Sequence, residues 1–188
     1  MLDLIAQRLA AHRPLTEDGD PVLRWAAVAL ILVPAPDALL LIRRAEAAGD
    51  PWSGHMALPG GRRSPTDQDL AAAAIRETAE EVGIGLTREA LLGALDDIAP
   101  RTPVLPPIAV RPFVFRLESR PPLELNAEVA AAAWVPLETA RHPDTYGTVT
   151  LHLHGADRVV PAYRFEESVV WGMTERILTR LFELVTSA

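Results

Sequence analysis

The sequence of 188 residues contains no cysteine and no lysine, so its 18 basic residues are all arginine. The absence of cysteine excludes disulfides, zinc thiolate sites and cysteine nucleophiles. The absence of lysine means that any side-chain cation that holds a phosphate must be arginine, which can bind through two parallel hydrogen bonds. The 25 acidic residues outnumber the basic ones and leave a net charge of −7. A general nucleic-acid-binding protein needs a basic face, which this composition does not indicate.

Apolar runs of membrane-spanning length are also missing. Residues 1–14 carry apolar side chains at Leu2, Ile5 and Leu9, which predicts a short amphipathic helix rather than a signal peptide. We therefore expect a protein of the cytoplasm that does not bind membranes. Hydrophobic residues make up 49% and charged residues 23%, as is typical of a globular protein. The length suits one domain over residues 1–188, with a helical extension at 1–24 and a C-terminal helix at 166–185.

Between these ends, strands and helices interleave without regular β-α-β repetition. Apolar runs predict strands at 25–33, 38–43, 91–97 and 108–117, and alternation predicts a hairpin strand near 151–154. An Ala-rich run predicts a helix at about 69–82. This order of elements favours an α/β/α sandwich around a mixed sheet.

Three glutamates near the end of the Ala-rich helix point to a function. Glu77, Glu80 and Glu81 are spaced i, i+3 and i+4, so they share one face of the last turns before the helix-ending Gly83. Carboxylates are unfavourable at a helix C-terminus, and they repel each other at i, i+4. Arg76 can relieve only Glu80, at i+4. A divalent cation on that face would account for the arrangement; the alternative is a solvated acidic face.

The residues around the triplet also suit a cation. Gly60 and Gly61 allow the backbone to approach a metal or a phosphate, and Asp67 is a candidate N-cap. The opposite helix face can pack on a sheet through small and apolar residues: Ala71, Ala74, Ile75, Thr78 and Val82. A Gly-rich loop, a capped helix and a carboxylate triplet together favour a hard cation with oxygen ligands.

Residues 76–84, Arg-Glu-Thr-Ala-Glu-Glu-Val-Gly-Ile, resemble the Nudix box, whose core is Arg-Glu-apolar-x-Glu-Glu-x-Gly-apolar. Thr78 occupies the usually apolar place. Gln68 stands where the box has a glutamate, with Asp67 as the nearest acid, and the spacing from glycine to arginine is one residue longer. These departures resemble the coenzyme A diphosphatase branch of the Nudix hydrolases.

Further stretches carry the same resemblance. Residues 40–45, Leu-Leu-Ile-Arg-Arg-Ala, are similar to the start of a signature of that branch, and residues 54–61, Gly-His-Met-Ala-Leu-Pro-Gly-Gly, are similar to its end. The internal arginine of the signature falls near Gly49 and Asp50 here, and an acid at this point would repel a 3′-phosphate. Residues 135–138, 163–165 and 170–178 resemble later elements, so the likeness spans about 25–182.

The resemblance implies the Nudix fold and Mg²⁺-dependent hydrolysis of a phosphoanhydride, with Mn²⁺ as a further cation. The implied metal ligands are the carboxylates of Glu77, Glu80 and Glu81 and the carbonyl of Gly61. We expect Glu77, or as a second choice Glu80, to accept the proton of the attacking water, and Arg76 to orient Glu80 and the loop. The candidate substrate contacts are Arg43, Arg44, Gly60 and Gly61. Arg62 and Arg63 are further candidates that a solvated surface explains equally well.

Coenzyme A, split into 4′-phosphopantetheine and 3′,5′-ADP, is the expected substrate. The alternatives are a Nudix enzyme for a nucleotide sugar, a dinucleotide or an oxidised nucleotide, and a Nudix domain that senses a ligand without catalysis. We expect Trp171 and Ile177 in the core. His152 and His154 share a strand face and could bind metal, although an exposed strand face explains them better. A nucleotide-derived ligand is the expected partner, and a homodimer remains open.

Overall fold

Two long apolar strands form the centre of the structure. β1 (Arg24–Val33) and β6 (Ile108–Arg116) run parallel, with Cα pairs from Arg24↔Ile108 to Leu32↔Arg116. Both strands are buried along most of their length, as expected where both faces of a sheet are covered. The structure, a computed structural model, describes the chain apart from residues 18–21, 48–52, 101–106, 154, 166–167 and 187–188.

Shorter strands extend this mixed sheet on both sides. β2 (Ala38–Arg44) is antiparallel to β1, and β7 (Val129–Pro136) is antiparallel to β2. β3 (Met56–Ala57) pairs with β2, and β5 (Leu91–Ala94) pairs with β6. The Gly-Gly pair lies in β4 (Gly60–Arg62), which is antiparallel to β1. The central strand therefore fixes the position of the Gly-rich loop.

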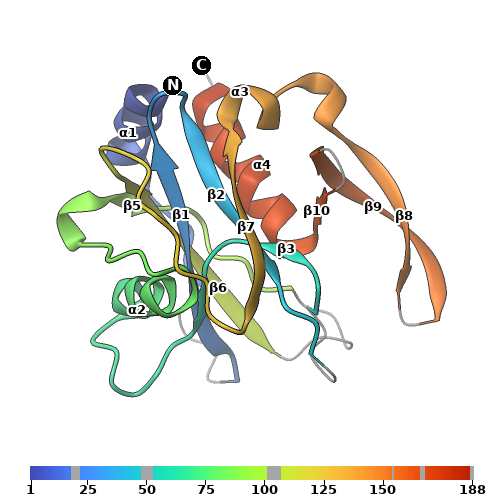
Figure 1. Ribbon diagram of the computed structural model, residues 1–188, viewed down its shortest axis with the longest axis horizontal. Helices are drawn as coiled ribbons and strands as arrows, with labels where there is room; N and C mark the ends of the chain where they lie inside the picture. Colours follow the sequence, from blue (N-terminus) through green and yellow to red (C-terminus); the bar gives the residue numbers. More distant parts are fainter. Residues whose placement is uncertain (18–21, 48–52, 101–106, 154, 166–167, 187–188) are drawn as a thin grey trace.

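Helices cover both faces of the sheet (Figure 1). α2 (Leu70–Val82) packs on one face, in a core cluster that includes Ala29 and Ile31 of β1. α1 (Leu2–Ala11) and α4 (Gly172–Thr186) pack on the other face, in a cluster that includes Leu30 and Leu32. Successive side chains of β1 thus point to opposite layers. The arrangement confirms the expected α/β/α sandwich around a mixed sheet. Of the helical extension expected over 1–24, the described residues form a helix at Leu2–Ala11.

A second sheet stands beside the sandwich. β8 (Tyr146–Leu153) and β9 (Ala156–Phe165) form a long hairpin, and β10 (Ser168–Trp171) pairs with β9. In Figure 1 the hairpin projects from the side of the molecule away from α2. The expected hairpin strand is confirmed, although His154 lies outside the described residues. The short helices α3 (Leu137–Ala140), η1 (Arg88–Ala90) and η2 (Pro143–Thr145) lie in connections.

The C-terminal helix begins later than the sequence predicted. The prediction of a helix over 166–185 is wrong at its start, because residues 168–171 form β10 and the helix covers Gly172–Thr186. Val169 and Val170 pair with β9, so this apolar run completes a sheet instead of starting the helix. Gly172, with a φ of 70°, then turns the chain into α4. None of the helices within the described residues is both long and apolar enough to cross a membrane.

Candidate active site

Helix α2 has well-formed ends. Its N-cap is Asp69, whose side chain accepts a hydrogen bond from the backbone N–H of Ala72 at 2.8 Å. The prediction that Asp67 caps the helix is therefore wrong by two residues. Gly83 ends the helix in the left-handed conformation, with a φ of 73°, as the sequence predicted. The face with Ala71, Ala74 and Val82 is buried against the sheet.

Asp67 instead holds Arg76. The guanidinium donates from Nε to Oδ1 and from Nη2 to Oδ2 of Asp67, both at 3.0 Å. The backbone N–H of Ser64 donates to the same carboxylate at 2.7 Å. This pairing lowers the pKa of Asp67 and raises that of Arg76. The bidentate contact ties the loop before α2 to the helix.

Arg76 binds more acids than the sequence predicted. Its Nη1 donates to Glu77 at 2.9 Å and to Glu80 at 3.2 Å, and its Nη2 donates to the carbonyl of Arg62 at 3.2 Å. The expectation that Arg76 relieves only Glu80 is therefore wrong, because its Nη1 also donates to Oε1 of the adjacent Glu77. Arg76 orients two carboxylates and the Gly-rich loop together.

The three glutamates have different environments. The exposed fraction of the side chain is 54% for Glu80, 18% for Glu77 and 2% for Glu81. Burial raises the pKa of Glu77, and Arg76 opposes this shift. Burial also raises the pKa of Glu81 to about 7, against the opposing effects of the Gly60 N–H and of Arg44. One helix face thus presents carboxylates with unequal affinity for protons.

Gly60 and Gly61 both lie close to their neighbours, Gly60 against the backbone of β1 and Gly61 against the carboxylate of Glu77. The N–H of Gly60 donates to Glu81 Oε2 at 2.8 Å, and a Cβ on Gly60 would lie 2.3 Å from the carbonyl oxygen of Ala27. A Cβ on Gly61 would lie 2.5 Å from Cδ of Glu77 and 2.6 Å from both its oxygens. The glycines therefore bring the loop backbone against two carboxylates of α2.

A cavity of about 910 Å³ opens beside this cluster. The predicted site residues Arg44, Gly60, Gly61, Glu77, Glu80 and Glu81 all line it, together with Arg62. The distance from Nη1 of Arg44 to Oε1 of Glu81 is 3.9 Å. Much of the remaining wall is apolar and comes from Val28, Met56, Ile108, Val110 and Met173. The cavity therefore joins a polar, acidic end to an apolar region.

Arg43 and Arg63 are not brought to this cavity. Arg43 is exposed and is not among the lining residues, because side chains alternate along β2 and Arg44 takes the inward position. Arg63 donates to the carbonyls of Asp67 and Gln68, so it supports the loop. The geometry thus does not support Arg43 as a substrate contact. Gly49 and Asp50, where the resemblance breaks, lie outside the described residues.

Glu128 is a site residue that the sequence reasoning missed. It precedes β7 and lines the cavity, and its charge contributes to the raised pKa of both Glu77 and Glu81. The backbone N–H of Ala45 donates to the carbonyl of Glu128 at 2.8 Å, which fixes this segment beside the end of β2. The sequence alone gives no motif that marks Glu128. Its place follows from the pairing of β7 with β2, which puts Val129 opposite Arg44.

Trp171 was expected in the core, but it is partly exposed and lines the cavity. Its ring meets that of His55 edge to face, with 4.7 Å between centroids. Ile177 also lines the cavity and is only 2% exposed, as expected of a core residue. His152 lines the cavity at the hairpin, where its Nδ1 lies 2.9 Å from Asp157 Oδ1.

The acidic residues suit a hard cation in chemistry, although they are not gathered as ligands. Among the residues that the structure describes, no three His, Asp or Glu side chains are grouped closely enough to hold an ion. Glu77 and Glu80 point to Arg76, and Glu81 points to the Gly60 N–H. A buried carboxylate with a pKa of about 7 beside two further glutamates is a donor set that fits Mg²⁺ or Mn²⁺.

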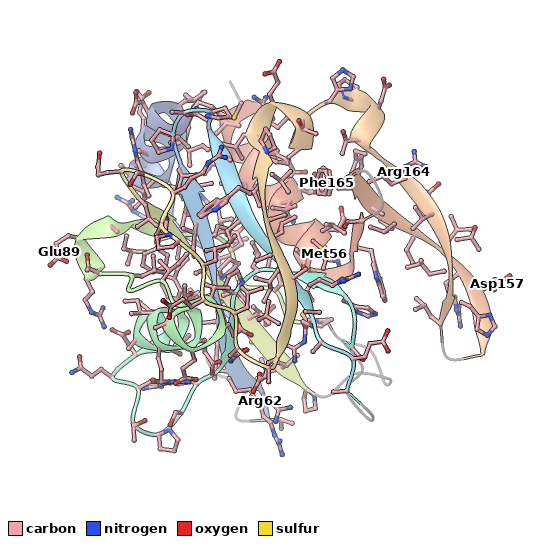
Figure 2. All side chains as sticks on the ribbon, in the orientation of Figure 1. Met56, Arg62, Glu89, Asp157, Arg164 and Phe165 are labelled. Atoms are coloured by element: carbon pink, nitrogen blue, oxygen red, sulfur yellow. The ribbon has the colours of Figure 1, made fainter. Side chains whose placement is uncertain are left out.

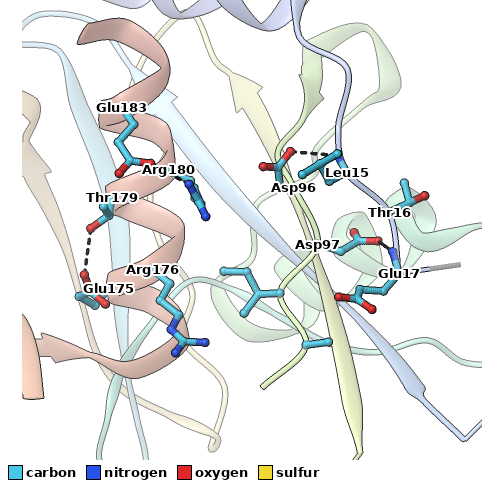
Figure 3. Close-up of a pocket in the computed structure, with 12 residues that line it drawn as sticks. Leu15, Thr16, Glu17, Asp96, Asp97, Glu175, Arg176, Thr179, Arg180 and Glu183 are labelled. Carbon is cyan, nitrogen blue, oxygen red and sulfur yellow. Dashed lines mark hydrogen bonds and ion pairs between the residues drawn. The ribbon is translucent and has the colours of Figure 1, made fainter. Parts of the chain in front are cut away.

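A second cavity, of about 570 Å³, lies between α4 and the segments around residues 15–17 and 96–99 (Figure 3). Its acids are engaged in structural hydrogen bonds. Asp96 accepts from the N–H of Leu15, and Asp97 accepts from the N–H of Glu17, both at 2.9 Å. Glu175 accepts from Thr179 at 2.9 Å. The first two bonds attach the segment after α1 to the segment after β5, and the third lies within α4.

Comparison with known proteins assigns the chain to a family. A model described as the NUDIX domain matches residues 23–152. The chain belongs to the Nudix family. It is 32% identical over 164 residues to the uncharacterized Nudix hydrolase NudL of Photorhabdus laumondii, covering 86% of this chain and 85% of that one. An uncharacterized protein of Schizosaccharomyces pombe is 45% identical over 111 residues, and this match covers 56% of this chain but only 34% of that protein.

Solved structures agree with the Nudix assignment. A MutT/nudix family protein from Enterococcus faecalis has a TM-score of 0.65 at 17% identity and covers 98% of this chain and 69% of its own, which shows the fold. An Ap4A hydrolase from C. elegans, solved as a binary complex, has a TM-score of 0.50 at 25% identity and covers 63% of this chain and 83% of its own. The protein is thus a Nudix hydrolase, of a family whose members include nucleotide pyrophosphatases.

Proposed function

We propose that this Nudix hydrolase cleaves the phosphoanhydride of a nucleoside diphosphate linked to another group, with Mg²⁺ as its cation and Mn²⁺ as a substitute. The observation that carries the proposal is the buried Glu81 beside Glu77 and the Gly60-Gly61 backbone, at one end of a cavity of about 910 Å³. A buried carboxylate is unfavourable without a partner, and a cation bound at Glu81 would remove this cost.

The proposed ligands are the carboxylates of Glu77, Glu80 and Glu81 with the carbonyl of Gly61. When bound, the cation neutralises phosphate charge and lowers the pKa of a bound water. Glu77 is the proposed base, because burial raises its pKa and Arg76 fixes its orientation. Glu80 is the second choice for the base. Glu128 adds a carboxylate to this end of the cavity.

Arg44 and Arg62 are the proposed contacts of the substrate phosphates. Both line the cavity next to the carboxylates, and arginine matches phosphate geometry with two donors. Gly60 and Gly61 add a backbone that a phosphate can approach. Arg76 is a positioning residue, since it already binds Asp67, Glu77 and Glu80.

Coenzyme A is the proposed substrate, giving 4′-phosphopantetheine and 3′,5′-ADP. The apolar wall of the cavity, with Val28, Met56 and Met173, suits a long and largely apolar arm such as pantetheine. A bifunctional NMN adenylyltransferase/ADP ribose pyrophosphatase from Francisella tularensis, solved with AMP and a Mn ion, is 26% identical with a TM-score of 0.50, and the match covers 72% of this chain and 39% of that protein. Its substrate class supports a nucleotide ligand here.

One assay on a panel of substrates distinguishes coenzyme A from the alternative substrates. Incubation with Mg²⁺ and coenzyme A, ADP-ribose, a nucleotide sugar, a dinucleotide or an oxidised nucleotide, followed by mass spectrometry, identifies the products. The proposal expects cleavage at the diphosphate with coenzyme A turned over fastest. Faster turnover of another diphosphate would show that this other nucleotide, and not coenzyme A, is the preferred substrate. Binding without turnover of any would instead indicate a ligand sensor.

The metal role is tested by Glu80→Gln, which should abolish Mg²⁺-dependent hydrolysis while leaving the fold intact, because this side chain is 54% exposed. The control is Glu89→Gln, an exposed glutamate of η1 that does not line the cavity (Figure 2). The control should keep the wild-type rate. Near-normal turnover by Glu80→Gln would refute the assignment of this ligand.

A further inference from the structure

Glu175 is a buried carboxylate that the proposed mechanism does not use. It lies in the first turn of α4, and the residue is only 5% exposed. A buried carboxylate is costly unless hydrogen bonds or a favourable dipole offset its charge. The N-terminus of α4 supplies part of that compensation. Among the described residues, the hydrogen-bond donors to Glu175 are both uncharged hydroxyl groups.

The two hydroxyl groups meet the same oxygen of Glu175. Tyr146 OH, from β8, donates to Oε1 at 3.0 Å, and Thr179 Oγ1, one turn further along α4, donates to it at 2.9 Å. Figure 3 shows the second of these bonds. Tyr163 OH, from β9, lies 2.9 Å from Thr179 Oγ1. Because Thr179 already gives its only hydroxyl proton to Glu175, Tyr163 is the donor in that pair.

These bonds join both strands of the hairpin to one helix. Tyr146 and Tyr163 are cross-strand partners at the base of β8–β9, with 4.8 Å between their ring centroids. Burial raises the pKa of Tyr163 to about 12 and, together with the bond to Glu175, raises that of Tyr146. Both phenols therefore keep their protons and remain donors at neutral pH. Tyr146, Tyr163, Glu175 and Thr179 thus form a polar clamp between the hairpin and α4.

The two parts that the clamp joins both line the catalytic cavity. Residues 171–174, where β10 passes into α4, line it, and so do Leu153 and Arg158 near the tip of the hairpin. Figure 1 shows α2 and the outer part of the hairpin on opposite sides of the molecule. A shift of the hairpin would therefore change the outer part of the cavity before it changed the end that holds the α2 carboxylates.

We propose that Glu175 is a positioning residue that holds the β8–β9 hairpin against α4 and so sets the affinity of the cavity for the part of the substrate beyond the diphosphate. The inference rests on the proposed function for the nature of that substrate. Glu175 acts through Tyr146 and Thr179, away from the reacting atoms. Loosening the clamp should weaken substrate binding and leave the chemical step at α2 unchanged, which is measured as a higher KM at constant kcat.

Tyr146→Phe tests the clamp with little risk to the fold, because it removes one hydroxyl from a residue that is 45% exposed. It should raise KM about fivefold and keep kcat within about twofold of the wild type, as expected for the loss of one hydrogen bond to a carboxylate. KM is measured on the panel substrate that the wild type turns over fastest. The Ki of methylenediphosphonate, a diphosphate analogue without any extension, should stay unchanged. A general structural defect would change kcat and both constants.

Two variants of Glu175 show whether the effect runs through the carboxylate. Glu175→Gln keeps an oxygen acceptor and should keep the wild-type KM, whereas Glu175→Leu should raise KM as Tyr146→Phe does. Adding Tyr146→Phe to Glu175→Leu should have no further effect, because the bond is already lost. Thr150→Val is the matched control, since it removes an exposed hydroxyl of the same strand that does not line the cavity.

Hydrogen exchange of the metal-free protein is a second readout that needs no turnover. In Tyr146→Phe and Glu175→Leu, the backbone amides of β8 and β9 should exchange about fivefold faster, and those of α2 should be unchanged. Unchanged exchange in the hairpin, or a loss of kcat at constant KM, would overturn the role of Glu175. If the wild type hydrolysed no member of the panel, the proposed function would be overturned, and faster exchange in the hairpin would still support the clamp.

Discussion

At the scale of single residues, the ionised carboxylate of Glu81 would bind a cation but destabilises the metal-free fold. Its pKa is raised from 4.5 to about 7, so the folded protein disfavours the ionised form. The associated stabilisation is fully present below the unfolded pKa and is lost as the pH rises through about 7. At higher pH the metal-free fold therefore carries a buried charge that the Gly60 N–H and Arg44 partly offset.

Replacing Glu81 should reverse this balance. Without divalent cations at about pH 8, Glu81→Gln should raise the free energy of unfolding by on the order of 1–3 kcal/mol, because a neutral amide replaces a desolvated carboxylate. At about pH 4 the gain should nearly vanish, since this pH lies below both the unfolded value of 4.5 and the folded pKa of Glu81. Urea unfolding with a chelator at both pH values measures the difference. Glu80→Gln is the control, and an equal gain in that variant would contradict the explanation.

The two adjacent glycines should respond differently to the same substitution. Gly60→Ala should destabilise the fold by several kcal/mol, because its Cβ would meet the Ala27 carbonyl oxygen at 2.3 Å at a φ of 149°. Gly61→Ala should mainly reduce kcat, by about tenfold or more, because its Cβ displaces the Glu77 carboxylate. Thermal unfolding and steady-state kinetics separate the effects. Loss of stability in Gly61→Ala as large as in Gly60→Ala would count against this division.

At the scale of elements, the loop before α2 is held by an acid that does not cap the helix. Both Asp67 and Asp69 stand near the helix start, and local sequence rules cannot distinguish them. The choice is made by Arg76, two turns further on, which takes Asp67 as its bidentate partner and leaves Asp69 as the cap. By contrast, the Ala-rich run and Gly83 act within one helix, so the extent of α2 was predictable from the sequence.

Replacing each aspartate by asparagine should distinguish the role of Asp67 from that of Asp69. Asp67→Asn should lower stability by on the order of 2 kcal/mol and reduce kcat, because it breaks a charged pair whose acid is 5% exposed and frees Arg76. Asp69→Asn should change both quantities little, because asparagine caps a helix about as well as aspartate. Chemical unfolding and kinetics of the two variants provide the measurement. The opposite ranking would mean that the cap, and not the pair, holds the loop.

At the scale of the whole molecule, local patterns predicted the layers but not all the pairings. Apolar runs and the positions of the helices were enough for an α/β/α sandwich. The parallel pairing of β1 with β6, the sheet position of residues 168–171 and the approach of Glu128 to the box all depend on contacts between distant segments. The same limit applies to Arg43 and Arg44, because only the strand's place in the sheet decides which of the two faces the cavity.

A cation bound at the proposed ligands should stabilise the whole fold. Mg²⁺ should raise the melting temperature of the wild type, because a ligand that binds only the folded state shifts the unfolding equilibrium. The increase should be larger at about pH 8 than at about pH 6, since a proton on Glu81 competes with the cation. Scanning calorimetry at several Mg²⁺ concentrations measures both effects. An unchanged response in Glu81→Gln would exclude this residue as a ligand.

The long pairing between β1 and β6 also sets the order in which the enzyme can mature. β1 is synthesised early, but its parallel partner follows α2 in the chain, and β4 holds the Gly-rich loop through β1. A nascent chain that has left the ribosome only as far as Gly83 carries the whole Nudix box without the completed sheet beneath it. Because β6 ends at Arg116, the sheet that holds the Gly-rich loop through β1 can be completed only after residue 116 has been synthesised.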